Sequence, residues 1–215
     1  MSEPESLDTH EPLTRRLERH WFDRLIMLSD GVFAIAMTLL ALEVRPPHEW
    51  NGDMLDLLAQ SWRALFGFAL SFLVIAFFWV NNRAIVARLQ RVDGPYTALT
   101  LILLCLICLT PFGTALVAEH GPNRAMRFYS FLVAASGVAQ ALLWGYAALL
   151  RDLVYPEIGR GERWFRLAGL LLIPLMFCVV GLTIGAGTSQ WTMMLVIVVA
   201  AGMGQLRRRL MRRIG

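Results

Sequence analysis

The chain has 215 residues, of which 57% are hydrophobic and 17% are charged, and its mean hydropathy is +0.55. These values exclude an ordinary soluble domain and indicate an integral membrane protein. The formal net charge is +4, and every lysine or arginine position is an arginine. Because the arginines flank apolar runs, they are typical of membrane topology signals and require no nucleic-acid partner.

Long apolar runs separated by charged segments predict an all-α integral membrane protein with six transmembrane helices and no separate soluble domain. The expected spans cover residues 24–44, 57–83, 96–118, 127–150, 165–187 and 190–206. Pro46 and Pro47 end the first span, and Pro111 and Pro174 are expected to kink the third and the fifth. The transmembrane domain then occupies residues 23–206, between an N-terminal segment at 1–22 and a basic tail at 207–215.

The arginines also predict the orientation. With six spans both ends of the chain lie on one side of the membrane, and sixteen arginines share that side while four lie on the other. By the positive-inside rule, both termini and the two terminal segments are expected in the cytoplasm. The N-terminal segment lacks the basic start and short apolar stretch of a cleaved signal peptide, so the first span is expected to remain in a multi-pass plasma-membrane protein.

The first span begins with ionisable residues. The uncharged run from Gly31 to Leu42 would be about 18 Å long as a helix, too short for a hydrocarbon core of about 30 Å. A helix over residues 24–44 reaches about 31 Å, and it includes Ser29 and Asp30. Charged groups inside a membrane usually face protein or a water-filled path. This pattern favours a channel or a transporter over a simple anchor.

The same helix is expected to have two different faces. At 100° per residue, Ile35, Leu39 and Leu42 form a narrow aliphatic stripe with Thr38 close beside it. Asp30 lies about 140° away from Ile35. The stripe is consistent with ordinary packing as well as with a pore lining, and Thr38 can instead bond its own helix backbone.

The second span offers partners for the acidic face. Trp79 and Asn82 can share one helix face, and both carry N–H donors that an antiparallel second helix would bring to the depth of Ser29 and Asp30. We hypothesise that this cluster fixes the rotation of the first helix. The alternatives are that Ser29 and Asp30 form a helix N-cap and that Trp79 is an interfacial anchor.

Other functions remain open from these residues alone. A proton- or cation-coupled secondary transporter would use Asp30 as its titrating carboxylate, although the chain shows no internal repeat of the kind that many transporters have. A membrane-embedded enzyme is not expected, because the spans hold no histidine box or carboxylate cluster. A purely structural assembly protein is a further alternative. The cysteines lie in apolar runs without metal-binding partners, so no metal site is expected.

The first span also resembles the signature of the transmembrane protein 175 family of potassium channels, in its bacterial branch. The matching string reads Arg24-x-x-x-Leu28-Ser29-Asp30-Gly31-Val-x-Ala-Ile-x-x-Thr38-Leu-Leu-x-Leu. The length and six-span layout resemble one bacterial subunit of that family. Two positions differ: Leu28 replaces the usual phenylalanine, and Asn82 stands where bacterial relatives usually carry a histidine.

The resemblance implies a modestly selective potassium channel in the bacterial inner membrane. It implies a homotetramer whose pore is lined by the first helix, with permeant K+ ions and no cofactor. By position, Ile35 matches the narrowest apolar constriction, Leu39 and Leu42 match further layers, and Thr38 matches a threonine layer. The polar network behind the pore helix is implied for Arg24, Ser29, Asp30 and Trp79, and Asn82 can still donate to Asp30.

Overall fold

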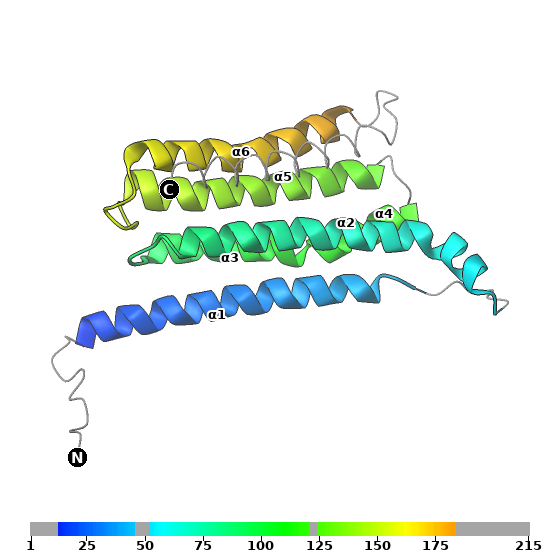
Figure 1. Ribbon diagram of the computed structural model, residues 1–215, viewed down its shortest axis with the longest axis horizontal. Coiled ribbons are helices and arrows are strands. Elements are labelled where there is room, and N and C mark those ends of the chain that lie inside the picture. The colour runs from blue at the N-terminus through cyan, green and yellow to red at the C-terminus, as the bar shows by residue number, and fades with distance from the viewer. Residues whose placement is uncertain (1–12, 46–51, 121–123, 184–215) are drawn as a thin grey trace, which may run out of the picture.

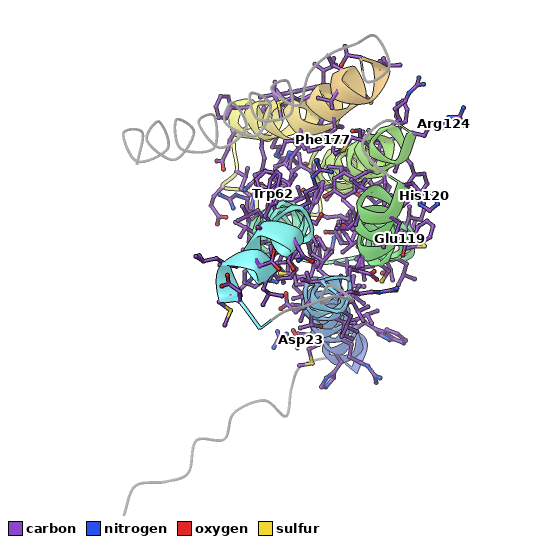
Figure 2. All side chains as sticks on the ribbon, turned by 90° about the vertical axis from the view of Figure 1, so that its right-hand side faces the viewer. Asp23, Trp62, Glu119, His120, Arg124 and Phe177 are labelled. Carbon is purple, nitrogen blue, oxygen red and sulfur yellow. The ribbon has the colours of Figure 1, made fainter. Side chains whose placement is uncertain are left out.

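The computed structural model describes residues 13–45, 52–120 and 124–183. Its regular elements there are helices: α1 (Leu13–Leu42), α2 (Met54–Val86), α3 (Gly94–Cys108), α4 (Thr110–His120), α5 (Arg124–Gly145), the π-helical turn η1 (Tyr146–Leu150) and α6 (Arg160–Thr183). In Figure 1, α1 forms one edge of the bundle, α2, α3 and α4 lie in the centre, and α5 and α6 lie at the other edge. Figure 2 views the bundle end-on and shows the same arrangement, with Asp23 on α1 and Phe177 on α6 at opposite sides.

Five helical stretches in the described residues are long and apolar enough to cross a membrane. They are Arg19–Leu42, Met54–Val86, Gly94–His120, Arg124–Leu150 and Arg160–Thr183. This confirms the all-α membrane class for the described part of the chain. The sixth expected span, 190–206, lies outside the described residues, as do the tail at 207–215 and residues 1–12 of the N-terminal segment.

Two predicted spans have different bounds in the structure. Helix α1 begins at Leu13 rather than near Arg24, because residues 13–23 contain no proline or glycine and are mostly good helix formers. The third span is two helices, since α3 ends at Cys108 and α4 begins at Thr110. Pro111 has no amide hydrogen to continue the first helix. In contrast, α6 runs without interruption through Pro174.

Aspartate side chains begin two of the central helices. Asp53 accepts a hydrogen bond from the Leu55 amide at 3.0 Å, and Asp93 accepts one from the Tyr96 amide at 2.9 Å. Each bond satisfies an amide that has no carbonyl partner in the first turn of a helix. Pro95 in the first turn of α3 has a backbone angle suited to that position.

A chain of buried hydroxyl groups holds α4 in place after the break at Leu109. The Tyr129 hydroxyl donates to Ser71 Oγ at 3.0 Å, the Ser71 and Thr114 oxygens lie 2.8 Å apart, and Thr114 donates to the Thr110 carbonyl at 3.0 Å. A hydroxyl has only one hydrogen, so Ser71 donates to Thr114 when Thr114 donates to the backbone. The chain therefore satisfies all three hydroxyls and joins α2, α4 and α5.

Helices α5 and α6 approach each other most closely at a glycine. A Cβ atom added at Gly137 would lie 2.8 Å from Cδ of Pro174, which is shorter than any normal carbon contact. The absence of a side chain at Gly137 thus allows the proline ring of α6 to lie against the backbone of α5. Helix α5 is the most enclosed span, with 67% of its most apolar window buried.

The loop between α2 and α3 is hydrogen-bonded to the loop between η1 and α6 at the arginine-rich end of the bundle. The Gln90 amide donates to the Leu153 carbonyl at 2.8 Å, and the Tyr155 amide donates to the Arg88 carbonyl at 3.1 Å. Arg163 donates to the Ala148 carbonyl at 2.7 Å. The two bonds between the loops connect the α1–α4 part of the bundle to α5 and α6, whereas the Arg163 bond connects α6 to η1.

Asp93 is the centre of a polar cluster at the same end. Its second carboxylate oxygen accepts a hydrogen bond from the Tyr146 hydroxyl at 2.7 Å and lies 3.5 Å from Arg151 Nε. Burial alone would raise the pKa of Asp93, but the hydrogen bonds from Tyr146, Tyr96 and Arg151 together outweigh it. The pKa of Asp93 is therefore lowered from its usual value of 3.8.

The close contact at Gly137 predicts that Gly137→Ala destabilises the protein. The added methyl group would overlap Pro174 and force α5 and α6 apart, at a cost of roughly 1–3 kcal/mol. The matched control is Gly145→Ala in the same helix, where the added Cβ would meet only Leu167 Cδ1 at 3.8 Å. Melting temperatures of the purified proteins measure the effect. Equal stability of the two variants would contradict the packing described here.

The lowered pKa of Asp93 predicts that Asp93→Asn destabilises the protein in a pH-dependent way. The pKa of Asp93 is lower in the folded state than its usual value of 3.8. The charged carboxylate therefore stabilises the fold fully above about pH 4, and this contribution is lost as the pH falls through the lowered folded-state pKa. At neutral pH we expect Asp93→Asn to lower the melting temperature by roughly 2–4 °C. The difference from the wild type should shrink on acidification toward about pH 3. A difference that stays constant across this range would show that the charge of Asp93 contributes nothing.

Candidate pore helix and its polar support

Helix α1 has one face packed against its own subunit. The buried side chains on this face recur every three or four residues, which is the repeat of a helical stripe. Phe33, Ala36 and Leu40 are almost fully buried, at 0%, 1% and 0% exposure. They belong to the main apolar core, so this face fixes how α1 sits on the bundle.

The predicted aliphatic stripe lies on the uncovered side of α1. Ile35, Leu39 and Leu42 are 59%, 41% and 72% exposed in the single chain. Thr38 is also exposed, and its hydroxyl donates to the Ile35 carbonyl at 2.8 Å. The stripe therefore does not pack on helices of its own subunit within the described residues. The Thr38 oxygen keeps its lone pairs free to accept a hydrogen bond or contact a cation.

The acidic flank of α1 contacts α2 through one direct hydrogen bond. Trp79 Nε1 donates to Asp30 Oδ1 at 2.8 Å, and both residues are half-buried. The Arg83 guanidinium carbon lies 5.1 Å from the centre of the Trp79 ring, within the range of a cation–π interaction. A cation over the indole face and a carboxylate at its N–H hold the ring between opposite charges.

Ser29 and Asn82 lie together, apart from the Asp30–Trp79 pair. The Ser29 hydroxyl donates to the Leu25 carbonyl at 2.9 Å. Asn82 is buried and lines the same small cavity as Ser29, between α1, α2 and α3. No hydrogen bond joins Asn82 to Asp30. Ser29 and Asp30 both lie well inside α1, so the structure does not support the N-cap alternative.

Arg24 does not join this cluster within the chain. Its side chain is exposed, and no hydrogen bond or ion pair links it to another described residue. On the helical wheel Arg24 is about 120° from Asp30 but only about 20° from Ile35. The arginine found beside Trp79 is Arg83, which the sequence reasoning did not select. Trp79 and Arg83 are four residues apart and so share one helix face, and this spacing could have identified Arg83 from the sequence.

Metal sites in proteins are built from histidine, cysteine or acidic side chains that lie close together. No group of three or more histidine, cysteine or acidic side chains comes together among the described residues. Figure 2 shows Glu119, His120 and Arg124 at the end of the bundle where α4 leads to α5. The exposed side of α1 is a long apolar face with a few polar groups.

Comparison with known proteins connects this helix to channels. The sequence model of the family described as "Endosomal/lysosomal potassium channel TMEM175" matches residues 24–111. A potassium channel of Streptomyces collinus is 32% identical over 141 residues, covering 63% of this chain and 68% of that protein. A potassium channel of Chamaesiphon minutus is 34% identical over 146 residues, covering 65% and 72%.

A solved structure has the same fold. The crystal structure of a lysosomal potassium-selective channel TMEM175 homolog from Chamaesiphon minutus superposes with a TM-score of 0.73 at 29% sequence identity. The match covers 86% of this chain and 97% of that one. The matched family segment begins at Arg24, in the helix that carries the exposed stripe and the Asp30 flank. Sequence and fold together show that this chain belongs to the TMEM175 channel family.

Proposed function

We propose that this protein is a potassium-selective channel that works as a homotetramer, with a pore lined by one copy of α1 from each subunit. The two bacterial relatives named as potassium channels support potassium as the permeant ion, because the matches cover 68% and 72% of their lengths. The position of α1 at one edge of the bundle supports the pore helix, since an edge helix can meet other copies of the chain.

The observation that carries the proposal is the exposure of the aliphatic stripe on an otherwise well-anchored helix. One face of α1 is buried in the subunit core, whereas Ile35, Leu39 and Leu42 project away from it. In a ring of four subunits, this geometry allows the stripes to face a common axis without any rearrangement of the subunit.

The side chains on the stripe suggest how ions are selected. A ring of four Ile35 side chains forms an apolar neck, and Leu39 and Leu42 add further apolar layers. Such a neck resists wetting, so an ion crosses only if it loses part of its hydration shell. Potassium loses water at a lower free-energy cost than sodium, which gives a modest preference for potassium. The exposed Thr38 hydroxyl supplies an oxygen beside the neck.

The Asp30–Trp79 hydrogen bond then acts as the support of the pore helix. It lies on a different face of α1 from the stripe, so it can fix the rotation of the helix without entering the pore. Ser29, Asn82 and Arg24 complete the set that the family resemblance implies. Ser29 lies on the inner side of α1, where Asn82 of α2 lines the same cavity, and Arg24 lies on the exposed side of α1.

The proposed setting is the inner membrane of a bacterium, with both termini in the cytoplasm. Arginines at the joined loops support this orientation, because positive charge accumulates on the cytoplasmic side. The loops contain Arg88, Arg91 and Arg151, and Arg160 is the first residue of α6. An antibody or protease accessibility assay on a tagged terminus tests it directly.

The constriction predicts that Ile35→Asn weakens discrimination between potassium and sodium. Four amide side chains would hydrate the neck and lower the barrier for sodium more than for potassium. We expect the sodium-to-potassium permeability ratio to rise several-fold. Reconstituted protein in proteoliposomes and planar bilayers measures flux and reversal potentials, with choline as the impermeant reference.

Ile35→Leu is the matched control, because it keeps the neck apolar and should keep the selectivity. Unchanged reversal potentials in Ile35→Asn would refute the assignment of the constriction. Wild-type protein that carries no potassium flux would refute the channel itself. Saturable uptake driven by a second ion gradient would instead favour a secondary transporter that uses Asp30.

If the Asp30–Trp79 hydrogen bond supports the pore helix, we expect Trp79→Phe to weaken the tetramer. The substitution keeps an aromatic ring near Arg83, but the smaller phenyl ring has no N–H to bind Asp30. A hydrogen bond to a charged group contributes roughly 1.5–3 kcal/mol, and half-exposure of this pair favours the lower end. We expect a lower melting temperature and a smaller tetramer fraction in size-exclusion chromatography.

Trp62→Phe provides the control, since Trp62 is exposed on the same helix and makes no hydrogen bond with a described residue. A double-mutant cycle with Asp30→Ala isolates the pair, because alanine has no oxygen that could accept the Trp79 N–H. Additive effects of Trp79→Phe and Asp30→Ala would mean that the bond does not stabilise the assembled protein.

A further inference from the structure

A small cavity separates α1 from α2 and α3 at the level of Ser29. Its volume is about 10 Å³, roughly the space that one water molecule occupies. Leu25 and Val86 contribute apolar walls, while Ser29, Asn82 and Thr100 contribute polar groups from the three different helices. All three polar residues are only 3% exposed.

Asn82 has more hydrogen-bonding capacity than the surrounding protein uses. Its side-chain amide carries two N–H donors and one oxygen acceptor, but it forms no hydrogen bond with any residue that the structure describes. A buried amide without partners costs roughly 1–3 kcal/mol, and a membrane protein has little water nearby to compensate. The neighbouring Asn81 does not share this feature, because its amide donates to the Phe77 carbonyl at 3.0 Å.

The two hydroxyls in the cavity have their hydrogens engaged elsewhere. Ser29 donates to the Leu25 carbonyl at 2.9 Å, and Thr100 donates to the Tyr96 carbonyl at 2.9 Å. Both oxygens can therefore only accept further hydrogen bonds inside the cavity. A molecule that accepts one bond from Asn82 and donates two bonds to the hydroxyls would give each of the three residues a hydrogen bond inside the cavity.

We propose that this cavity binds one structural water that links α1 to α2 and α3. The water accepts a hydrogen bond from Asn82 Nδ2 and donates to the hydroxyl oxygens of Ser29 and Thr100. Water fits this set because it has two donors, accepts two bonds and needs between two and four polar partners. The link holds the inner side of α1, on a different face from the Asp30–Trp79 bond.

A bound cation fits the cavity less well than water. The three polar side chains are neutral, most of the wall is apolar, and no group of three metal-binding side chains occurs among the described residues. An alkali cation in so small a space would lack most of the oxygen ligands that replace its hydration shell.

The sign of the change in melting temperature caused by one substitution tests the proposal. If Asn82 binds a water, Asn82→Leu removes the link and leaves two hydroxyl oxygens unsolvated, so the melting temperature should fall by roughly 2–4 °C. If the amide has no partner, the same change removes a buried unsatisfied group, and the melting temperature should rise. A rise would overturn the proposal.

A double-mutant cycle gives a second reading that does not depend on that sign. Asn82→Leu and Ser29→Ala should combine less than additively, because either change alone removes the shared water. Ser136→Ala is the matched control: Ser136 is also buried and also donates to the carbonyl four residues earlier, but it lies on α5. It should combine additively with Asn82→Leu. If Asn82→Leu does not fold, the pair Ser29→Ala and Thr100→Val carries the same test.

A structure of the full-length protein at a resolution that shows ordered water completes the experiment. One density peak within hydrogen-bonding distance of Asn82, Ser29 and Thr100, missing in Asn82→Leu, would support the proposal. A dependence of the melting temperature on sodium or potassium concentration that is present in the wild type and lost in Asn82→Leu would replace the water by a cation and overturn the proposal. These readouts do not use ion flux, so their failure leaves the proposed channel function unaffected, and loss of that function leaves them unaffected.

Discussion

The rotation of α1 about its own axis determines what its side chains can do. Neighbouring residues differ by 100°, so a turn of one residue would exchange Ile35 for Ala36 on the exposed face and bury the aliphatic stripe. Two interactions on different faces prevent this turn. Phe33 and Leu40 are packed into the core on one face, and Asp30 is bound to Trp79 on the flank.

Satisfied polar groups explain much of the remaining architecture. Inside the bundle, the hydroxyl chain of Tyr129, Ser71 and Thr114 holds α4 to α2 and α5 where Pro111 interrupts the third span. Near the loops, Arg163 donates to backbone carbonyls that follow the end of α5. In both places a local break in regular helix exposes polar backbone groups, and side chains from other helices compensate. The helices are therefore tied together at these breaks, in addition to the Asp30–Trp79 bond that joins the uninterrupted parts of α1 and α2.

The sequence was sufficient to predict the membrane class and the Asp30–Trp79 pairing. Hydropathy identifies long apolar helices reliably, and an acid buried in a span requires a donor at the same depth, which Trp79 provided. Other features depend on tertiary contacts that a single sequence does not reveal. The close approach of Pro174 to Gly137 is of this kind. In contrast, Pro111 indicated a kink in the third span, and α3 ends at Cys108 before α4 begins at Thr110.

The arrangement of the polar cluster shows the same limit. The family resemblance grouped Arg24 with Asn82 and Asp30, but the helical wheel puts Arg24 near the exposed stripe, and the structure leaves it exposed there. Asn82 turns toward the Ser29 cavity because α3 supplies a third wall. The sequences of α1 and α2 alone do not indicate that α3 lines this cavity.

An exposed aliphatic stripe can in principle face lipid as well as a pore, because lipid tails are as apolar as leucine. The polar residues near the stripe distinguish the two. Thr38 lies about 60° from Ile35 and is exposed, and Arg24 lies on nearly the same face, within about 20° of Ile35. A lipid-facing surface gains nothing from a threonine beside its leucines, and it disfavours an arginine unless the side chain reaches the headgroups. A pore uses both, since the hydroxyl can contact a partly dehydrated ion and the arginine can remain in water at the end of the path. The proposed shared axis therefore gives Thr38 and Arg24 a role that a face buried in the bilayer would not.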